Sequence, residues 1–162
     1  MNDNELDRSY MEQAIALAKQ AEEIDEVPVG ALIVCRGRVI ATAYNTRETE
    51  RCATCHAELR AIEAACRALG GWRLPDSTLY VTLEPCPMCA GAILHARLDR
   101  VVYGAADPKA GAFGSVLDLN SFPLNHKTAV TGGVLAEECG ALLSGYFRAK
   151  REARKKAKEV TS

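Results

Sequence analysis

The chain has 162 residues, of which 48% are hydrophobic and 25% are charged, and its formal net charge is −1. This length allows one domain, residues 1–162, with a real core, and the composition is ordinary for a soluble globular protein. The sequence contains no apolar run long enough to span a membrane, and the balanced charge gives no overall attraction to nucleic acids.

The first part of the chain is predicted to form a helix followed by two strands. Residues 6–23 repeat apolar side chains at helical spacing, and Val27-Pro28-Val29 ends the helix. Residues 30–35 and 39–44 are rich in apolar residues and enclose a tight turn, which predicts a pair of strands. Asn45 ends the second strand.

Helices and strands alternate in the rest of the chain. The expected elements are a helix capped by Thr54 that ends at Gly70, a strand at 78–83, a helix at 86–96, a short strand at 101–104, one helical turn near Val116, a strand or extended lead-in at 130–134 and a basic final helix at about 135–158. This alternation predicts an α/β fold with a central mixed sheet of about five strands.

Two cysteines lie where the strand at 78–83 runs into the following helix. Cys86 and Cys89 fall in the predicted first turn, where backbone N–H groups lack intrahelical partners and the helix dipole is positive. Both features favour the thiolate, which is the form that binds metals. A Cys-x-x-Cys pair across a helix start therefore predicts half of a zinc site.

His56 and Glu58 lie upstream, at the start of the helix expected after Thr54. Side chains two positions apart on a helix do not face each other, so these two can converge only beyond its N-terminus. His56, Cys86 and Cys89 would give three ligands and one open position, the pattern of a catalytic zinc, with one ion per chain. Glu58 would then lie beside water and transfer its proton.

Other interpretations of the cysteines remain open. A closed four-thiolate site would combine Cys52 and Cys55 with the later pair, although it would leave His56 and Glu58 without a role. The Cys-x-x-Cys-His run that ends at His56 also matches a haem-attachment pattern, and all of these residues could be ordinary thiols. The seven cysteines and the lack of a recognisable signal peptide predict a cytoplasmic chain with reduced thiols.

The charges are unevenly distributed, with acidic residues crowding the start and basic residues crowding the end, from Arg148 to Lys158. A basic amphipathic end can face RNA, and a solvated terminal helix is the alternative. Phe147 shares a helical row with Arg151 and Arg154, so an aromatic ring and several cations can face one partner.

H-x-E followed by P-C-x-x-C is the signature of zinc-dependent nucleobase deaminases. The chain resembles the cytidine and deoxycytidylate deaminase superfamily and, within it, the bacterial tRNA-specific adenosine deaminases, over nearly its whole length. The segments that carry the resemblance are VPVGALIV at 27–34, AYN at 43–45, HAE at 56–58, LYVTLEPCPMCAGAILHAR at 79–97, RVVYGAADPKAGAFGS at 100–115, LNHK at 124–127 and SGYFR at 144–148.

The resemblance implies a three-layer cytidine-deaminase-like fold and hydrolytic deamination of adenosine to inosine at the wobble position of a tRNA anticodon loop. It gives His56, Cys86 and Cys89 the role of zinc ligands and Glu58 that of the proton shuttle. It also implies a homodimer, for which Met88, Ala92 and Leu94 are candidate packing positions.

Five further residues match substrate-binding positions of this family. Asn45 matches the residue that hydrogen-bonds the flipped base, and the backbone at Ala57 would bind the base edge. Asp107 and Lys109 match loop residues near the sugar and backbone, and Phe147 matches an aromatic beside the anticodon loop. The plainer alternatives are a strand-ending Asn, a turn before a proline and a core aromatic.

The chain departs from the family pattern in two places. Cys52-Ala53-Thr54-Cys55 stands where the family often has Asp-Pro-Thr-Ala, which loosens the loop and puts a thiol able to mis-ligate or oxidise beside His56. Ala106 stands where a basic residue is common, so one phosphate contact is expected to be lost.

Two other functions remain at this point. A free nucleobase or nucleoside deaminase, such as a guanine deaminase, shares H-x-E and PCPMC but needs neither the basic tail nor GAADPKAGA. A catalytically silent zinc domain that only binds RNA would have no need of Glu58.

Overall fold

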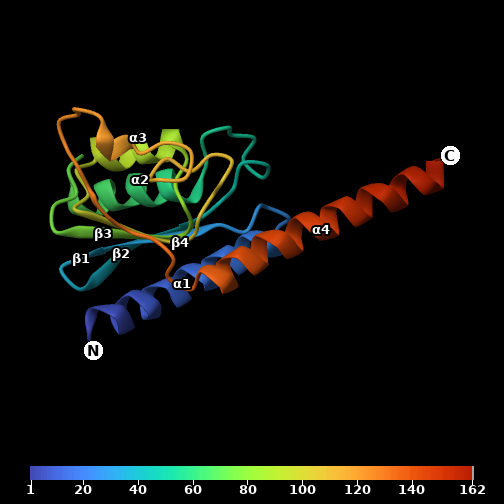
Figure 1. Ribbon diagram of the computed structural model, residues 1–162, viewed down its shortest axis with the longest axis horizontal. Helices are drawn as coiled ribbons and strands as arrows, with labels where there is room; N and C mark the ends of the chain where they lie inside the picture. The colour runs from blue at the N-terminus through green and yellow to red at the C-terminus, as the bar shows by residue number, and fades with distance from the viewer. Residues whose placement is uncertain (162) are drawn as a thin grey trace.

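The computed structural model describes residues 1–161, in which a five-stranded mixed sheet separates two pairs of helices (Figure 1). The strand order is β2-β1-β3-β4-β5, with β1 antiparallel to β2 and β3, and with β3, β4 and β5 mutually parallel. The strands are β1 (Gly30–Cys35), β2 (Arg38–Tyr44), β3 (Ser77–Leu83), β4 (Arg100–Ala105) and β5 (Ala129–Thr131). The predicted α/β fold is confirmed.

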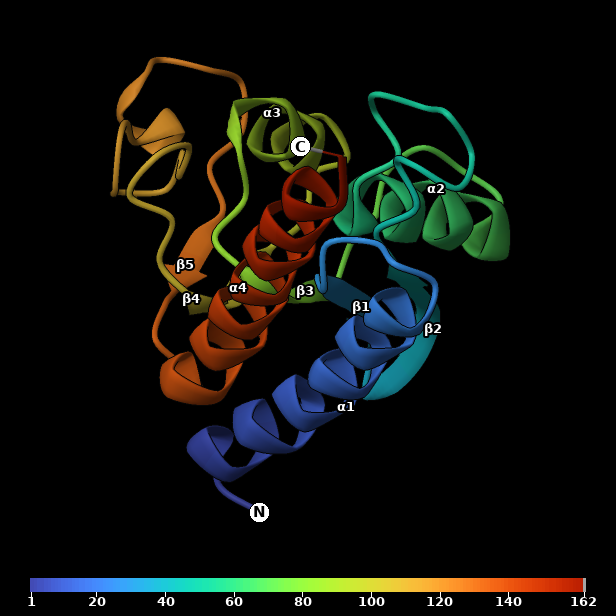
Figure 2. The ribbon, with the colours of Figure 1, turned by 90° about the vertical axis from the view of Figure 1, so that its right-hand side faces the viewer.

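Helices α2 (Ala57–Leu69) and α3 (Pro87–His95) cover one face of the sheet, and α1 (Asp3–Glu23) and α4 (Ala136–Thr161) cover the other (Figures 1 and 2). Alternate residues of β1 pack on opposite faces of the sheet. Ala31 and Ile33 belong to the core beneath α2 and α3, whereas Leu32 and Val34 pack with Met11 of α1. Because successive strand side chains point to opposite faces, this central strand is apolar throughout. The result is three layers with two cores.

Helix α1 begins three residues earlier than expected, at Asp3. The Asn2 side chain accepts a hydrogen bond from the backbone N–H of Glu5, and the Glu5 carboxylate accepts one from the backbone N–H of Asn2. This capping box satisfies two N–H groups at the helix start. Its Asn-x-x-Glu spacing was readable in the sequence.

The predicted N-cap of α2 is wrong. The N-cap is His56 rather than Thr54, and its side chain makes no capping hydrogen bond. The Thr54 hydroxyl instead lies 3.5 Å from Cys52 Sγ, within the turn that precedes the helix. Because His56 stands at the boundary in extended conformation, its imidazole is free to turn away from the helix.

Two smaller elements also differ from their predicted positions. The helical turn expected near Val116 lies at η1 (Leu119–Ser121), where the Asp118 side chain accepts from the Asn120 N–H. Strand β5 is shorter than the expected segment, and α4 begins after Leu135, which has a φ of 53°. In residues 1–161, none of the helices is both long and apolar enough to cross a membrane.

Candidate metal centre and substrate pocket

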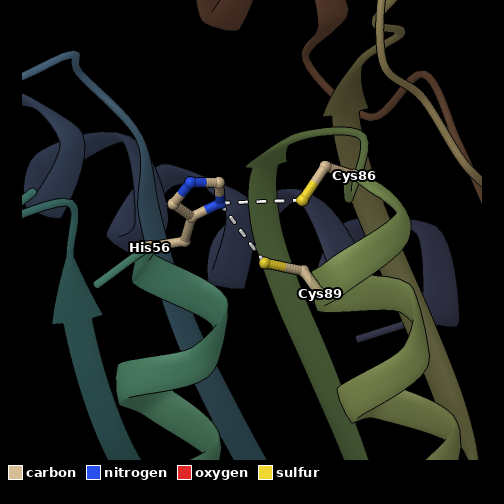
Figure 3. A group of neighbouring side chains, drawn as sticks. All are labelled: His56, Cys86 and Cys89. Atoms are coloured by element: carbon tan, nitrogen blue, oxygen red, sulfur yellow. Dashed lines mark hydrogen bonds between the residues drawn. The ribbon is translucent and has the colours of Figure 1, made fainter. Parts of the chain in front are cut away.

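The N-terminal ends of α2 and α3 bring three ligand side chains together above the sheet (Figure 3). His56 immediately precedes α2, Cys86 precedes α3, and Cys89 lies in the first turn of α3. The Nδ1 atom of His56 is 3.7 Å from Cys86 Sγ and 3.5 Å from Cys89 Sγ. The expected convergence of the HAE and PCPMC motifs is present.

The geometry of this group fits one zinc ion. In a tetrahedral site with usual Zn–N and Zn–S bond lengths, a nitrogen and a sulfur ligand lie about 3.6 Å apart. The two observed N–S distances, 3.7 and 3.5 Å, bracket that value. The three side chains could therefore hold zinc without moving the backbone and leave a fourth position open.

The pKa values of the two thiols are shifted in opposite directions. A hydrogen bond from the Cys89 thiol, supported by one from His56, lowers the pKa of Cys86 to about 4. The same bond to Cys86, with burial, raises the pKa of Cys89, and the bond to Cys86 also raises the pKa of His56. Cys86 thus favours the thiolate, and metal binding would displace the Cys89 proton and require an unprotonated Nδ1 on His56.

Glu58 is buried, with 5% of its surface exposed, and burial raises the pKa of its carboxyl. It lines a pocket of about 260 Å³ together with His56 and Cys86. In the described residues it is not part of the His/Cys/Cys ligand group. A buried carboxyl beside the open metal position has the placement that proton transfer requires.

Asn45 and Ala57 line the same pocket. The Asn45 amide donates to the Val27 carbonyl at 3.4 Å, but its Oδ1 is buried without a hydrogen-bond partner among residues 1–161. An unpaired buried acceptor is costly unless a ligand supplies the donor. Asn45 thus ends its strand and also has an unpaired acceptor while lining the pocket.

The predicted loop residues divide between the pocket and its edge. Asp107 lines the pocket, and its carboxylate also accepts hydrogen bonds from the backbone N–H groups of Lys109 and Ala110, at 3.0 and 3.2 Å. Lys109 is not among the lining residues. Asp107 thus forms the turn that was the plainer alternative and still borders the cavity.

Phe147 of α4 lines the pocket and is 45% exposed. Two neighbouring residues of α4 bind the loop after α1. The Tyr146 hydroxyl donates a hydrogen bond to the Asp25 carbonyl at 3.1 Å, and Lys150 Nζ lies 2.6 Å from an Asp25 carboxylate oxygen. The alternative of a core phenylalanine is therefore excluded.

A groove of about 820 Å³ continues from Phe147 along α4. Lys150, Arg151 and Arg154 line it, which confirms that they share a side of the helix with the aromatic ring. Lys150 is paired with Asp25. Beyond this groove the last turns of α4 extend past the rest of the molecule (Figure 1).

Cys52 and Cys55 form a disulfide, so the prediction that all thiols are reduced is wrong for this pair. The bridged turn lies just ahead of His56, and its Cys55 carbonyl accepts from the Thr46 N–H at 3.1 Å. Because both sulfurs are bonded to each other, the four-thiolate interpretation does not describe this structure.

Arg47 and Glu84 line the pocket as well, and sequence reasoning missed both. Arg47 follows Asn45 in a polar loop with no distinguishing pattern. Glu84 offered no local signal either, because the hydrogen-bond donors that allow its burial come from the distant residues 107–115.

The chain is similar to known proteins over most of its length. A family model for the cytidine and deoxycytidylate deaminase zinc-binding region matches residues 4–105. A tRNA-specific adenosine deaminase of Bacillus subtilis is 52% identical over 96% of this chain and 98% of its own length. One from Haemophilus influenzae is 46% identical over 94% of this chain and 89% of its own length.

Solved structures show the same likeness. One from a study of A-to-I editing by tRNA deaminases at the wobble position is 47% identical, with a TM-score of 0.81 over 83% of this chain and 99% of the other. A guanine deaminase from Nitrosomonas europaea has a TM-score of 0.73 at 27% identity, over 86% of this chain and 83% of the other. The tRNA-editing structure is thus the nearer of these two in both sequence and fold.

Proposed function

The chain belongs to the cytidine and deoxycytidylate deaminase family, and on this premise we propose that it hydrolyses adenosine to inosine at the wobble position of a tRNA anticodon. The observation that carries this proposal is the continuity of one surface. The zinc-type ligand group and a buried glutamate lie at a base-sized pocket, and Phe147 lines both this pocket and the neighbouring groove. Lys150, Arg151 and Arg154 line that groove together with Asp25 and Glu48. A deaminase of free bases has no need of that groove.

His56, Cys86 and Cys89 would hold the zinc ion, which when bound lowers the pKa of a water molecule to about 7. Glu58 accepts one proton from that water and delivers it to the adenine ring nitrogen, where it stays. Glu58 then takes the second proton, from the hydroxyl added at C6, and delivers it to the departing amino group as the C6–N bond breaks. Water and adenosine are thereby converted into inosine and ammonia. Glu58 is 5% exposed, so bulk water has little access to the carboxyl while it carries these protons.

The pocket favours a base that has left its stack. Its volume of about 260 Å³ admits a single base and no duplex. An unpaired loop nucleotide can be splayed out at little cost, whereas a paired one must first be unstacked and unpaired. We assign Asn45 and the backbone at Ala57 to the base edge, and Asp107 and Lys109 to the adjoining sugar and phosphate.

Phe147 and the groove would bind the nucleotides beside the target base. Stacking on an aromatic contributes roughly 1–3 kcal/mol per base, so Phe147→Ala is expected to weaken tRNA binding about tenfold or more. Each phosphate contact to a single strand adds about 0.7 to the slope of log K against log salt. Arg151→Gln/Arg154→Gln should therefore flatten that slope by about 1.4, with zinc content unchanged.

Binding titrations with labelled tRNA at several salt concentrations measure both effects. Lys155→Gln/Lys156→Gln is the matched control, because it removes the same charge from residues that do not line the groove. If the two double variants have equal slopes of log K against log salt and Phe147→Ala binds tRNA like wild type, this part of α4 does not contact the RNA and is only a solvated helix.

We also propose that residues 1–162 act as a single deaminase domain, in the cytoplasm and as a homodimer. Met88 at the start of α3 is 37% exposed and remains a candidate for contacts between chains. Leu94 is 4% exposed because it packs inside its own chain, so the expectation that it serves such a contact is wrong.

A further inference from the structure

Glu84 is a buried carboxylate that the reaction described above does not use. It follows β3, stands two residues before Cys86 and is 1% exposed. In the described part of the chain it forms no ion pair with a basic side chain. A carboxylate this deeply buried needs several hydrogen-bond donors in place of water.

Within residues 1–161, the side-chain oxygens of Glu84 accept hydrogen bonds from one segment, the 107–115 loop, which lies between β4 and η1. The backbone N–H of Asp107 donates to Oε1 at 3.1 Å, and those of Phe113 and Ser115 donate to Oε2 at 3.1 and 3.2 Å. The Ser115 hydroxyl donates to Oε1 as well. A single side chain therefore holds both ends of this loop.

The loop is also fitted closely around the carboxylate. A Cβ added at Gly111 would lie 2.3 Å from Glu84 Cδ, and the backbone N–H of Ala112 donates to the Pro85 carbonyl at 2.9 Å. Glycine at position 111 therefore permits an approach that no other residue allows. The loop conformation depends on Glu84 at its ends and at its middle.

This loop forms one wall of the substrate pocket, through Asp107 and Ala110. Glu84 thus connects the segment that carries a metal ligand to the segment that faces the nucleotide. We propose that Glu84 is a positioning residue, which fixes the wall formed by the 107–115 loop and so sets the affinity for the nucleotide around the target base. This inference rests on the proposed function, since it concerns the substrate of that same site.

Glu84→Gln tests the proposal with almost no change in side-chain volume. An amide nitrogen placed at the Oε2 position would leave two backbone N–H groups without an acceptor. An amide nitrogen at the Oε1 position would leave only the backbone N–H of Asp107 without an acceptor. The Ser115 hydroxyl can rotate and accept a hydrogen bond from the new amide. The second orientation costs less, so the loop should be released at Asp107, its pocket end.

The zinc-loaded full-length enzyme is assayed on an anticodon stem-loop. For Glu84→Gln we expect KM to rise about tenfold or more, with kcat within a few-fold of wild type and zinc content retained. In Glu84→Gln, hydrogen–deuterium exchange of the backbone N–H should become faster at Asp107 than in wild type, and the increase should be larger than at Phe113 or Ser115. Gly111→Ala, which presses on the carboxylate from the other side, should also raise KM, and the double variant should show less than the sum of both effects.

Gly140→Ala is the control, because an added Cβ at that α4 position meets nothing within 4 Å. Wild-type activity on the stem-loop is measured first, and its absence would refute the proposed function rather than this inference. If wild type is active, a lowered melting temperature with unchanged KM in Glu84→Gln and Gly111→Ala would overturn the positioning role. Should Glu84→Gln fail to fold, KM of Gly111→Ala relative to Gly140→Ala decides the question.

Discussion

Replacing Glu58 with glutamine is expected to remove most of the deaminase activity while the fold and the zinc content stay intact. Glutamine has nearly the same shape but cannot accept and release the proton that must move from water to the base. Positioned general acid–base groups contribute roughly 10²- to 10⁴-fold, so the rate of the chemical step should fall by at least that factor. Single-turnover inosine formation, with zinc measured in the same samples, provides the test.

Glu63→Gln is the matched control for that experiment, because Glu63 lies on the same helix and is exposed to solvent. It should react at the wild-type rate. A Glu58→Gln enzyme within a few-fold of wild type would remove Glu58 from the role of proton shuttle, whatever its position in the pocket.

Replacing Cys86 with alanine is expected to abolish zinc binding and, with it, activity. The three ligand atoms converge within 4.8 Å of one another, and loss of one thiolate leaves too few ligands for a tightly held ion. Elemental analysis should give close to one zinc per chain in the wild-type protein and close to none in Cys86→Ala.

Cys52→Ser separates this site from the four-thiolate alternative. Because Cys52 is bonded to Cys55 rather than directed at the ligand group, this variant should keep its zinc. Loss of zinc in Cys52→Ser, or its retention in Cys86→Ala, would contradict the assignment of the ligands.

The centre of the fold and of the site was predictable because both depend on local patterns. Short runs rich in apolar residues identified the strands, and the H-x-E and P-C-x-x-C motifs each lie at a helix start, where short-range geometry fixes the direction of the side chains. Two helix starts packed on one sheet face leave little freedom for the ligands. His56, Cys86 and Cys89 therefore converged as expected.

The features that sequence reasoning missed depend on contacts between distant segments. Thr54 has the side chain of a good N-cap, but the disulfide-bridged turn holds it against Cys52 and moves the boundary of the helix to His56. Glu84 gains its significance only when residues 107–115 fold back on it, and no local pattern signals four donors from a loop about 30 positions later. Likewise, the pairing of Lys150 with Asp25 joins residues 125 positions apart.

The most direct test of the proposed function is a comparison of substrates under identical conditions. The zinc-loaded enzyme is given unmodified tRNA, and separately adenosine, guanine and cytidine, and ammonia release is measured as kcat/KM for each. We expect the tRNA to be deaminated far more efficiently than any free base or nucleoside, with inosine found only at the wobble position. A higher kcat/KM for guanine or another small substrate than for tRNA would contradict the assignment and favour a free-base deaminase.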